Sequence, residues 1–293
     1  MNAGVVVIIG AGPAGISAAI QLKRYGVETL VVEREQVGGL LLNANLVENY
    51  PGFPDGISGP RLVALFERQM ERIGVGVTRD EVLKLDFNRD RFLVKTRVTQ
   101  EQADFVIVAS GTKPRPFPVE VPVELHGKIY ADVWPLLHLR EKHILVVGAG
   151  DAAFDYALNL ARQNRVTLMN RSTETRCLPL LYERAIAHSQ ISYWVNTKIK
   201  AITQYEAGAG MQLCCMMEDG KLVGDYLVFA IGREPQQDFI SPGLGQQEET
   251  LIQQGRLYYV GDVCNGLYRQ TSIATGDGLR AAMKIYTKMR NDA

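Results

Sequence analysis

Two glycine-rich turns carry most of the chemistry that this sequence implies. They are Gly10-Ala11-Gly12-Pro13-Ala14-Gly15 and Gly148-Ala149-Gly150-Asp151-Ala152-Ala153. In such a turn the first glycine permits a tight bend, the second lets backbone N–H groups approach a pyrophosphate, and the third position lets helix and strand pack closely. The phosphates then lie at the positive end of the helix. Each turn therefore predicts a site for a dinucleotide.

The first turn is expected to stand between a strand and a helix. An apolar run from Val5 to Ile9 predicts a buried parallel strand, and apolar residues from Ile16 to Leu22 recur at helical spacing. A second strand is predicted from Val27 to Val32, followed by Glu33. At this spacing a carboxylate can accept hydrogen bonds from an adenosine ribose. The alternative is a glycine-rich turn that binds no ligand.

The second turn repeats this arrangement less completely. We expect a strand from His143 to Val147, a helix from Ala152 to Arg162 and a strand from Val166 to Met169. The last strand leads into Asn170-Arg171-Ser172, so that no carboxylate is available for a ribose.

Arg171 and Arg176 offer a different ligand group at the second turn. Guanidinium groups bind phosphate through paired, charge-assisted hydrogen bonds, so these two side chains could hold the 2′-phosphate of NADPH. The alternative is that both are solvated loop residues.

The composition excludes several functional classes. The chain has 293 residues, 46% of them hydrophobic, and 32 basic residues balance 32 acidic ones, which argues against nucleic acid as a ligand. Neither a cleavable leader nor an apolar run of membrane-spanning length is present, so we expect a cytoplasmic protein with no membrane association. Four irregularly spaced cysteines and four histidines without metal-ligand spacing predict neither a disulfide framework nor a metal site.

Two similar strand exits suggest how the domains are arranged. The run from Phe105 ends in Ala109-Ser110-Gly111, and the run from Tyr226 ends similarly at Gly232. A proline-rich segment, Pro114 to Pro122, follows the first exit and cannot form a helix or a central strand. We predict an α/β fold of two Rossmann-like three-layer nucleotide-binding domains. The second, residues 115–232, is inserted in the first, residues 1–114 and 233–293.

A segment near the C-terminus is expected to complete the first site. The run from Leu257 ends in Gly261-Asp262, and a helical pattern extends from Ile273 to Met289. Asp262 could accept hydrogen bonds from ribityl hydroxyls, or be an ordinary turn residue. The helix N-terminus near Thr271 could stabilise negative charge on a reduced flavin.

Taken together, these motifs make the chain similar to the thioredoxin reductase-like flavoproteins, which are FAD-dependent pyridine nucleotide-disulfide oxidoreductases. The resemblance covers nearly the whole chain and implies FAD in the first domain, NADPH or NADH in the second, a homodimer and rotation of one domain against the other. The motifs that carry it, and that it implies in cofactor binding, include the first turn, Glu33, Val37-Gly38-Gly39-Leu40, Glu48-Asn49-Tyr50-Pro51-Gly52-Phe53, Ala109-Ser110-Gly111, Gly261-Asp262 and Arg269-Gln270-Thr271.

The sequence departs from this family at two places. The redox Cys-x-x-Cys of thioredoxin reductases falls on Ala131-Asp132-Val133-Trp134, where no thiolate nucleophile is available. The family's His-Arg-Arg-x-x-x-Arg stands here as Asn170 to Arg176, which leaves the choice between NADPH and NADH open. The stretch from Gly148 to Asp155 is also similar to the thioredoxin reductase-like ferredoxin/flavodoxin–NADP reductases, which lack the cysteine pair.

Three functions follow from these features. The first is transfer of electrons from NAD(P)H through FAD to a protein or quinone acceptor such as ferredoxin or flavodoxin, with the flavin as the redox centre. The second is disulfide reduction, with a thioredoxin-like partner, by relocated cysteines, for which the candidates are Cys177, Cys214, Cys215 and Cys264. The third is a ferredoxin-linked flavoprotein that does not use NAD(P)H and holds another dinucleotide, such as a second FAD; a flavin-binding sensor is its non-enzymatic form.

Overall fold

The computed structural model describes residues 4–207 and 210–292, which divide into two compact units. Within this part of the chain, unit 1 comprises residues 4–42, 47–113 and 234–292, and unit 2 comprises residues 43–46 and 114–233. The sequence predicts domain boundaries near residues 114 and 233. In the structure, the chain passes from one unit to the other after Lys113 and after Arg233. The segment Asn43–Leu46 was expected in the first domain, but its hydrogen bonds lie in unit 2.

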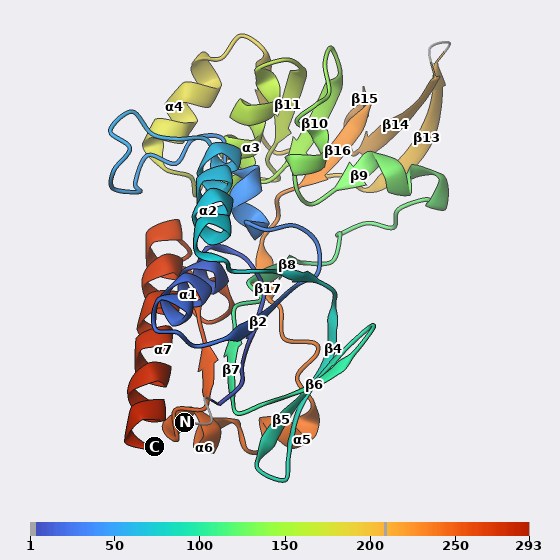
Figure 1. The fold of residues 1–293 in the computed structure, drawn as a ribbon. Helices are drawn as coiled ribbons and strands as arrows, with labels where there is room; N and C mark the ends of the chain where they lie inside the picture. Colours follow the sequence, from blue (N-terminus) through green and yellow to red (C-terminus); the bar gives the residue numbers. More distant parts are fainter. Residues whose placement is uncertain (1–3, 208–209, 293) are drawn as a thin grey trace. The chain divides into compact units, whose positions relative to one another are not determined.

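Unit 1 is built on a parallel sheet with the strand order β18-β7-β1-β2-β3 (Figure 1). Every residue of β1 and β7 is buried, as expected for a parallel sheet that is covered on both faces. β2 begins at Thr29 rather than at Val27. The strands are β1 (Val6–Ile9), β2 (Thr29–Glu33), β3 (Thr78–Arg79), β7 (Phe105–Val108) and β18 (Leu257–Tyr259).

Successive side chains of β1 point to opposite faces of the sheet, and each set contacts one of the two outer layers of unit 1. Val6 and Ile8 pack against the helices α1 (Pro13–Arg24) and α7 (Thr271–Asn291), whereas Val7 and Ile9 pack toward an antiparallel sheet on the other face. That sheet consists of β4 (Val82–Asn88), β5 (Arg91–Thr96) and β6 (Gln100–Ala103). The remaining helices of the unit are α2 (Gly59–Ile73), α5 (Pro242–Gly245), α6 (Glu248–Gln253) and the 3₁₀ turns η1 (Gly39–Asn43) and η4 (Gly261–Val263).

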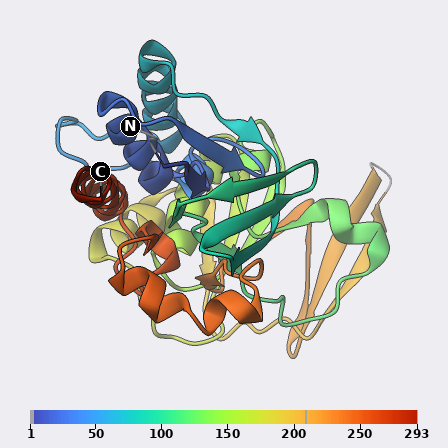
Figure 2. The same cartoon turned by 60° about the horizontal axis from the view of Figure 1, so that its bottom comes forward.

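Unit 2 repeats this three-layer plan. Its parallel sheet has the order β12-β11-β10-β16-β9, with α3 on one face and an antiparallel sheet of β13, β14 and β15 on the other. The antiparallel strands can be followed in Figure 2, in tan and orange. The elements are β9 (Ile129–Tyr130), β10 (His143–Val147), α3 (Asp151–Ala161), β11 (Arg165–Met169), α4 (Pro179–Ala187), β12 (Ile191–Trp194), β13 (Ala201–Ala207), β14 (Gly210–Met217), β15 (Gly220–Gly224), β16 (Tyr226–Phe229), η2 (Val123–Lys128) and η3 (Trp134–Leu136).

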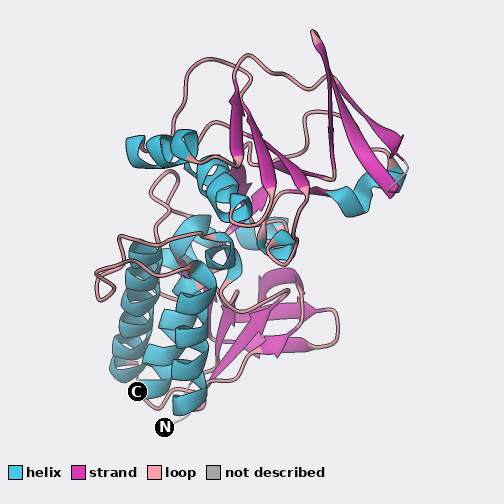
Figure 3. Ribbon diagram, turned by 90° about the horizontal axis from the view of Figure 1, so that it is seen from above, coloured by secondary structure: helices cyan, strands magenta, loops and turns pink. Residues whose placement is uncertain are grey.

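The two units thus share one architecture, and Figure 3 shows the helices in cyan and the strands in magenta. The predicted fold class, two Rossmann-like three-layer domains, is confirmed. The strands β8 (Thr112–Pro114) and β17 (Arg233–Pro235) pair with each other and carry the chain out of unit 1 and back. Within the described residues, no helix is both long enough and apolar enough to cross a membrane.

Candidate functional site

The turn after β1 is held in a shape that only glycine permits at two positions. Gly10 has a φ of +103°, and a Cβ atom there would lie 2.4 Å from the carbonyl oxygen of Ala109 on the neighbouring strand exit. A Cβ atom on Gly15 would lie 1.9 Å from the carbonyl oxygen of Gly10. Larger residues at either position would push the strand, the turn and α1 apart.

Gly12 differs from these two glycines because its surroundings are open. Its backbone is extended, with a φ of −75° and a ψ of −178°, and no described atom lies within 4 Å of the position of a Cβ atom. Gly12 is also the N-cap of α1 and makes no side-chain cap. The main chain of the turn is therefore free to approach a pyrophosphate at the positive end of α1.

The carboxylate of Glu33 lies at the same turn. Its Oε2 atom accepts a hydrogen bond of 2.7 Å from the N–H of Ala11, and its Oε1 atom accepts one of 2.8 Å from the N–H of Glu35. β2 ends at Glu33, so the strand delivers this side chain to the carboxyl edge of the sheet. This is the position from which a ribose could be bound.

Two further segments surround the first turn. Gly38 donates a hydrogen bond of 2.8 Å to the carbonyl oxygen of Ala11, and a Cβ atom on Gly39 would lie 3.6 Å from the Cα atom of Gly12. The segment that continues into Leu40 therefore lies against the turn. On the other side, Gly111 has a φ of +65° in the exit from β7.

The C-terminal segment reaches the turn through Gly261. This residue has a φ of +73°, and a Cβ atom there would lie 2.9 Å from the Cβ atom of Ala14 in α1. Asp262 follows it and is partly buried. Gln270, the N-cap of α7, accepts a hydrogen bond of 2.9 Å from the side chain of Asn49.

The structure thus brings the residues expected in the first site to the carboxyl ends of β1, β2, β7 and β18. Arg269 is partly buried directly before this N-cap, and Thr271 is the first residue of α7.

The turn after β10 reproduces the geometry of the first. A Cβ atom on Gly148 would lie 2.5 Å from the carbonyl oxygen of Ala230, the counterpart of Ala109 in the exit from β16. Gly150 has an extended backbone, with a φ of −106° and a ψ of 179°, and again no described atom lies within 4 Å of a Cβ position. Unit 2 therefore presents a second open helix N-terminus, that of α3.

The loop after β11 is folded back onto this second turn. The N–H of Arg176 donates a hydrogen bond of 2.8 Å to the carbonyl oxygen of Ala149. Asn170 is 1% exposed, and its amide nitrogen donates to the carbonyl oxygen of Glu174 and to the hydroxyl of Tyr193. These hydrogen bonds fix the path of the loop. The side chain of Arg171, which directly follows the buried Asn170, is exposed.

The first residues of α3 complete the second turn. Asp151 accepts a hydrogen bond of 2.7 Å from the N–H of Leu178, and Ala152 is exposed in the first turn of the helix. Asp151 therefore ties the residues that precede α4 to the N-terminus of α3.

Comparison with known proteins identifies the family of the chain. The sequence profile of the family described as pyridine nucleotide-disulphide oxidoreductase matches residues 4–278. The chain belongs to this family.

Its relatives include several thioredoxin reductases. The chain is 32% identical to the thioredoxin reductase of Mycolicibacterium smegmatis over 292 residues, which covers 95% of this chain and 94% of that protein. The chain is 31% identical to the thioredoxin reductase of Streptomyces clavuligerus over 294 residues, which covers 95% of this chain and 91% of that protein. The crystal structure of Lactococcus lactis thioredoxin reductase superposes with a TM-score of 0.84 at 26% identity and covers 98% of this chain and 99% of that one. This pyridine nucleotide-disulphide oxidoreductase is thus an FAD-dependent enzyme of the thioredoxin reductase type, a group that binds FAD and NADPH.

The turn from Ala131 to Trp134 is held by a network of hydrogen bonds to polar side chains. Asn43 is 4% exposed, and its Oδ1 atom accepts hydrogen bonds of 2.9 Å from the N–H groups of both Val133 and Trp134. Its Nδ2 atom donates to Asp132 over 3.1 Å, and Arg233 donates to the same carboxylate over 3.0 Å. All of these residues lie in unit 2. The turn is therefore stabilised by an amide and an ion pair.

Asp155 in α3 binds the main chain of Asn45, in the same segment Asn43–Leu46. Its Oδ2 atom accepts a hydrogen bond of 2.9 Å from the N–H of Asn45. Burial raises the pKa of Asp155 from its usual 3.8 to about 6, although the hydrogen bond from Asn45 and the charge of Arg162 act in the opposite direction.

This raised pKa predicts a pH-dependent contribution to stability. The folded protein holds the Asp155 proton more tightly than the unfolded chain, so the free energy of unfolding falls as the pH rises from about 4 to about 6 and then stays lower, by up to about 3 kcal/mol. Asp155→Asn removes this titration. In urea denaturation at pH 4.5 and pH 7.5, we expect the variant to gain stability relative to the wild type as the pH rises. An unchanged difference between the two proteins would contradict the assignment.

Neither Asn43 nor Asp155 was among the candidate residues of the sequence. Asn43 directly follows Leu40-Leu41-Leu42, and a polar residue after three leucines is the one signal that could have drawn attention to it.

The four cysteines are free and dispersed. Cys177, Cys214 and Cys215 lie in unit 2, and Cys264 lies in unit 1. Cys214 and Cys215 are buried in β14, where burial raises the pKa of Cys215 to about 12 and so disfavours a thiolate. Cys264 is exposed just beyond Asp262, and partial burial of its sulfur also raises its pKa.

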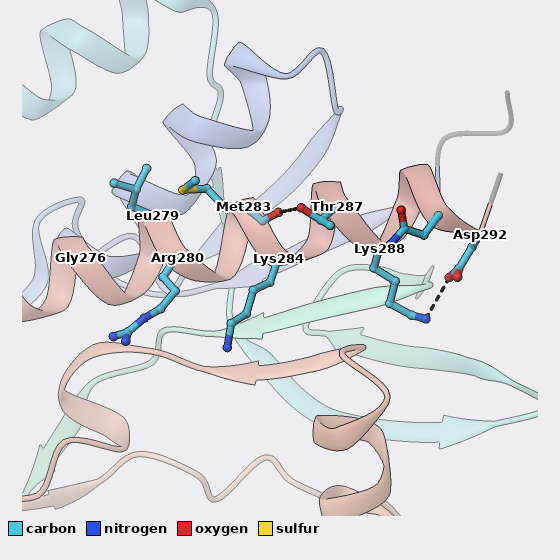
Figure 4. A pocket seen from close by; sticks show the side chains of 9 residues that line it. Gly276, Leu279, Arg280, Met283, Lys284, Thr287, Lys288 and Asp292 are labelled. Atoms are coloured by element: carbon cyan, nitrogen blue, oxygen red, sulfur yellow. Dashed lines mark hydrogen bonds and ion pairs between the residues drawn. The ribbon is translucent and has the colours of Figure 1, made fainter.

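A surface hollow of about 580 Å³ runs along α7 (Figure 4). Its lining comes from one helix and includes Leu279, Met283 and Lys284. In Figure 4 the side chain of Met283 lies beside that of Leu279, and Thr287 donates a hydrogen bond to the carbonyl oxygen of Met283. Because a single helix lines it, this hollow is an open helix face and not a nucleotide site.

Proposed function

We propose that this enzyme transfers electrons from NADPH or NADH through FAD to a protein or quinone acceptor, such as ferredoxin or flavodoxin, without a redox dithiol. Two features of unit 2 support the proposal. The second turn is open at Gly150, and Asn43 donates a hydrogen bond to Asp132 in the turn on which the resemblance to thioredoxin reductases places their cysteine pair. FAD, when bound, supplies the chemistry by accepting two electrons from the nicotinamide and releasing them to the acceptor.

The residues of unit 1 fit an FAD molecule. The open space at Gly12 accommodates a pyrophosphate, and Glu33 is placed to bind the adenosine ribose. Asp262 would accept hydrogen bonds from ribityl hydroxyls, and the N-terminus of α7 after Gln270 would stabilise negative charge on the reduced ring. Gly39, Leu40, Ala109 and Gly111 would form the walls of the same site.

Unit 2 would bind the nicotinamide nucleotide at Gly150, with Arg171 and Arg176 at the 2′-phosphate. Replacing both arginines with alanine is then expected to raise the KM for NADPH by about 10- to 100-fold, because charge-assisted hydrogen bonds to phosphate are lost. Steady-state kinetics with NADH in the same variant provides the control, since NADH lacks that phosphate. Equal effects on both nucleotides, or none, would show that the arginines do not read the 2′-phosphate.

The test of the function is an anaerobic titration of the purified holoenzyme with NADPH and then NADH, while flavin absorbance is followed. Bleaching at one FAD per chain supports the proposal, and the acceptor is then sought among ferredoxin, flavodoxin, quinones and thioredoxin-like proteins. Two FAD per chain, or reduction only by reduced ferredoxin, would favour a second pocket that holds another dinucleotide. We expect the active species to be a homodimer, which sedimentation analysis checks.

A second candidate function is suggested by Cys264, which is exposed two residues after Asp262. In that case the enzyme would reduce a disulfide of a thioredoxin-like partner with a relocated thiol. A variant in which all four cysteines are replaced by serine discriminates the two functions. Retained flavin reduction and retained transfer to the acceptor would support the dithiol-free function, whereas loss of disulfide reduction in this variant alone would support the thiol-based one.

A further inference from the structure

A carboxylate of α7 closes the turn of unit 1 that contains Asp262, residues 261–265, here called the Asp262 turn. The Oδ2 atom of Asp277 accepts a hydrogen bond of 2.7 Å from the side-chain nitrogen of Asn265 and one of 3.3 Å from the N–H of Gly261. Gly261 is the first residue of the turn and Asn265 is the last. A single oxygen atom of α7 therefore joins the two ends of the turn.

The carboxylate of Asp277 is mostly buried and well paired. Its side chain is 13% exposed, and its Oδ1 atom accepts a hydrogen bond of 2.6 Å from Arg280 on the same helix. A buried carboxylate is costly unless donors surround it, and here the turn supplies two of the three donors. Hydrogen bonds to an ionised acceptor are also stronger than those between neutral groups. Asp277 therefore holds the turn firmly.

α7 is itself fixed against α1 beside Asp277. A Cβ atom on the next residue, Gly278, would lie 2.0 Å from the carbonyl oxygen of Ala14. One turn earlier in α1 and α7, the hydroxyl of Ser17 donates a hydrogen bond of 2.7 Å to the carbonyl oxygen of Thr275. Because the N-terminus of α1 is the proposed pyrophosphate site, this contact gives Asp277 a defined position relative to that site.

The Asp262 turn meets α1 directly as well. A Cβ atom on Gly261, whose φ is +73°, would lie 2.9 Å from the Cβ atom of Ala14. Within the turn, the N–H of Cys264 donates a hydrogen bond of 3.1 Å to the carbonyl oxygen of Gly261. This internal bond shapes the turn, whereas the bonds to Asp277 fix the turn to α7.

We propose that Asp277 is a positioning residue of the flavin site, which holds the Asp262 turn where Asp262 reaches the ribityl hydroxyls of FAD. The inference rests on the proposed function of the first turn. α1 would bind the pyrophosphate of FAD and Asp262 the ribityl chain of the same molecule, so the two must be correctly spaced. Asp277 sets this spacing before FAD binds, because it joins the turn to the helix that packs on α1.

The test is a double-mutant cycle on FAD affinity, measured by titration of the apoprotein with FAD. Asp262→Ala should weaken FAD binding by about 10- to 100-fold, because hydrogen bonds to a charged group are lost. Asp277→Ala should weaken it by about fivefold or more, because the turn must then be ordered when FAD binds. The double variant should bind FAD within about twofold of Asp262→Ala, because Asp277 acts through Asp262. Losses that multiply in the double variant would overturn the proposal.

Asp277→Asn tests whether the hydrogen bonds carry the effect. Its amide oxygen keeps an acceptor for Gly261 and Asn265, and its amide nitrogen can face the solvent beside Arg280, whose side chain is 68% exposed. FAD affinity should therefore stay within about threefold of the wild type. A loss as large as that of Asp277→Ala would overturn the proposed role of the two hydrogen bonds.

Asp104→Ala is the matched control. Asp104 also accepts hydrogen bonds from a main-chain N–H, that of Val5 at 2.8 Å, and from an arginine, Arg91 at 2.9 Å. It directly precedes β7, at the amino end of the sheet, whereas the flavin site lies at the carboxyl end. Thermal unfolding of the apoproteins should show a loss of stability in both alanine variants, and FAD affinity should fall only in Asp277→Ala. An equal fall in Asp104→Ala would overturn the proposal, because general destabilisation would then explain the effect.

Hydrogen exchange examines the turn without FAD. The N–H of Gly261 should be protected in the wild-type apoprotein and exchange at least about tenfold faster in Asp277→Ala. Equal exchange in the two proteins overturns the positioning role. FAD binding that Asp262→Ala leaves unchanged also overturns it and leaves the proposed electron transfer intact, whereas a wild type that binds no FAD contradicts the proposed function itself.

Discussion

Replacement of Gly12 with valine should give a folded protein that has lost its FAD. The backbone of Gly12 is extended and no described atom lies within 4 Å of its Cβ position, so the apoprotein accommodates the new side chain. The isopropyl group would occupy the space over the N-terminus of α1 that a pyrophosphate needs. Losing two charge-assisted hydrogen bonds costs about 3 kcal/mol, or a fall in FAD affinity of roughly 100-fold or more.

The measurement is the FAD content after gel filtration, together with the thermal unfolding of both apoproteins. Gly15→Ala serves as the contrasting variant, because its Cβ atom would lie 1.9 Å from the carbonyl oxygen of Gly10. That change should destabilise unit 1 itself, by about 3 kcal/mol. If Gly12→Val retained FAD at full occupancy, the first turn would not be the pyrophosphate site.

Replacement of Gly150 with valine should have the complementary effect, in which FAD is retained but NAD(P)H no longer reduces it. The backbone of Gly150 is also extended and its Cβ position is also open, so unit 2 should fold. By the argument used for Gly12, nucleotide affinity should fall roughly 100-fold or more. Stopped-flow bleaching of the flavin by NADPH and by NADH measures the effect.

Dithionite reduction provides the control for Gly150→Val, since a chemical reductant bypasses the second site. The variant should be bleached by dithionite as completely as the wild type. Normal bleaching by a nicotinamide nucleotide would mean that the nucleotide binds elsewhere in the chain. The two valine variants thus examine the two sites separately.

The sequence was sufficient for features that depend on backbone sterics. Gly10 and Gly148 mark turns that the structure closes against the carbonyl oxygens of Ala109 and Ala230. The continuous apolar run from Val5 to Ile9 predicts a buried strand, and the structure buries every residue from Val6 to Ile9. Such features follow from which residue fits a given conformation, a property that a single sequence displays.

The sequence was not sufficient for features that depend on long-range hydrogen bonds. The hydrogen bonds that Val133 and Trp134 donate to Asn43 join residues about ninety positions apart, and no spacing rule relates them. Segment Asn43–Leu46 was consequently expected in the first domain. The side-chain positions of Arg171 and Arg176 likewise depend on how Asn170 folds the loop, which the order of residues does not record.

The paired strands β8 and β17 bear on how such a chain could have been assembled from simpler parts. Their hydrogen bonds from Gln236 to Gly111 and from Arg115 to Gly232 place Lys113 opposite Glu234, where the chain leaves unit 1 and returns. A tight hairpin turn that connected these two residues would replace residues 114–233 and leave the strands of unit 1 in place. A module inserted at such a hairpin would leave the central sheet of unit 1 intact, because both exits lie next to each other at the same pair of strands.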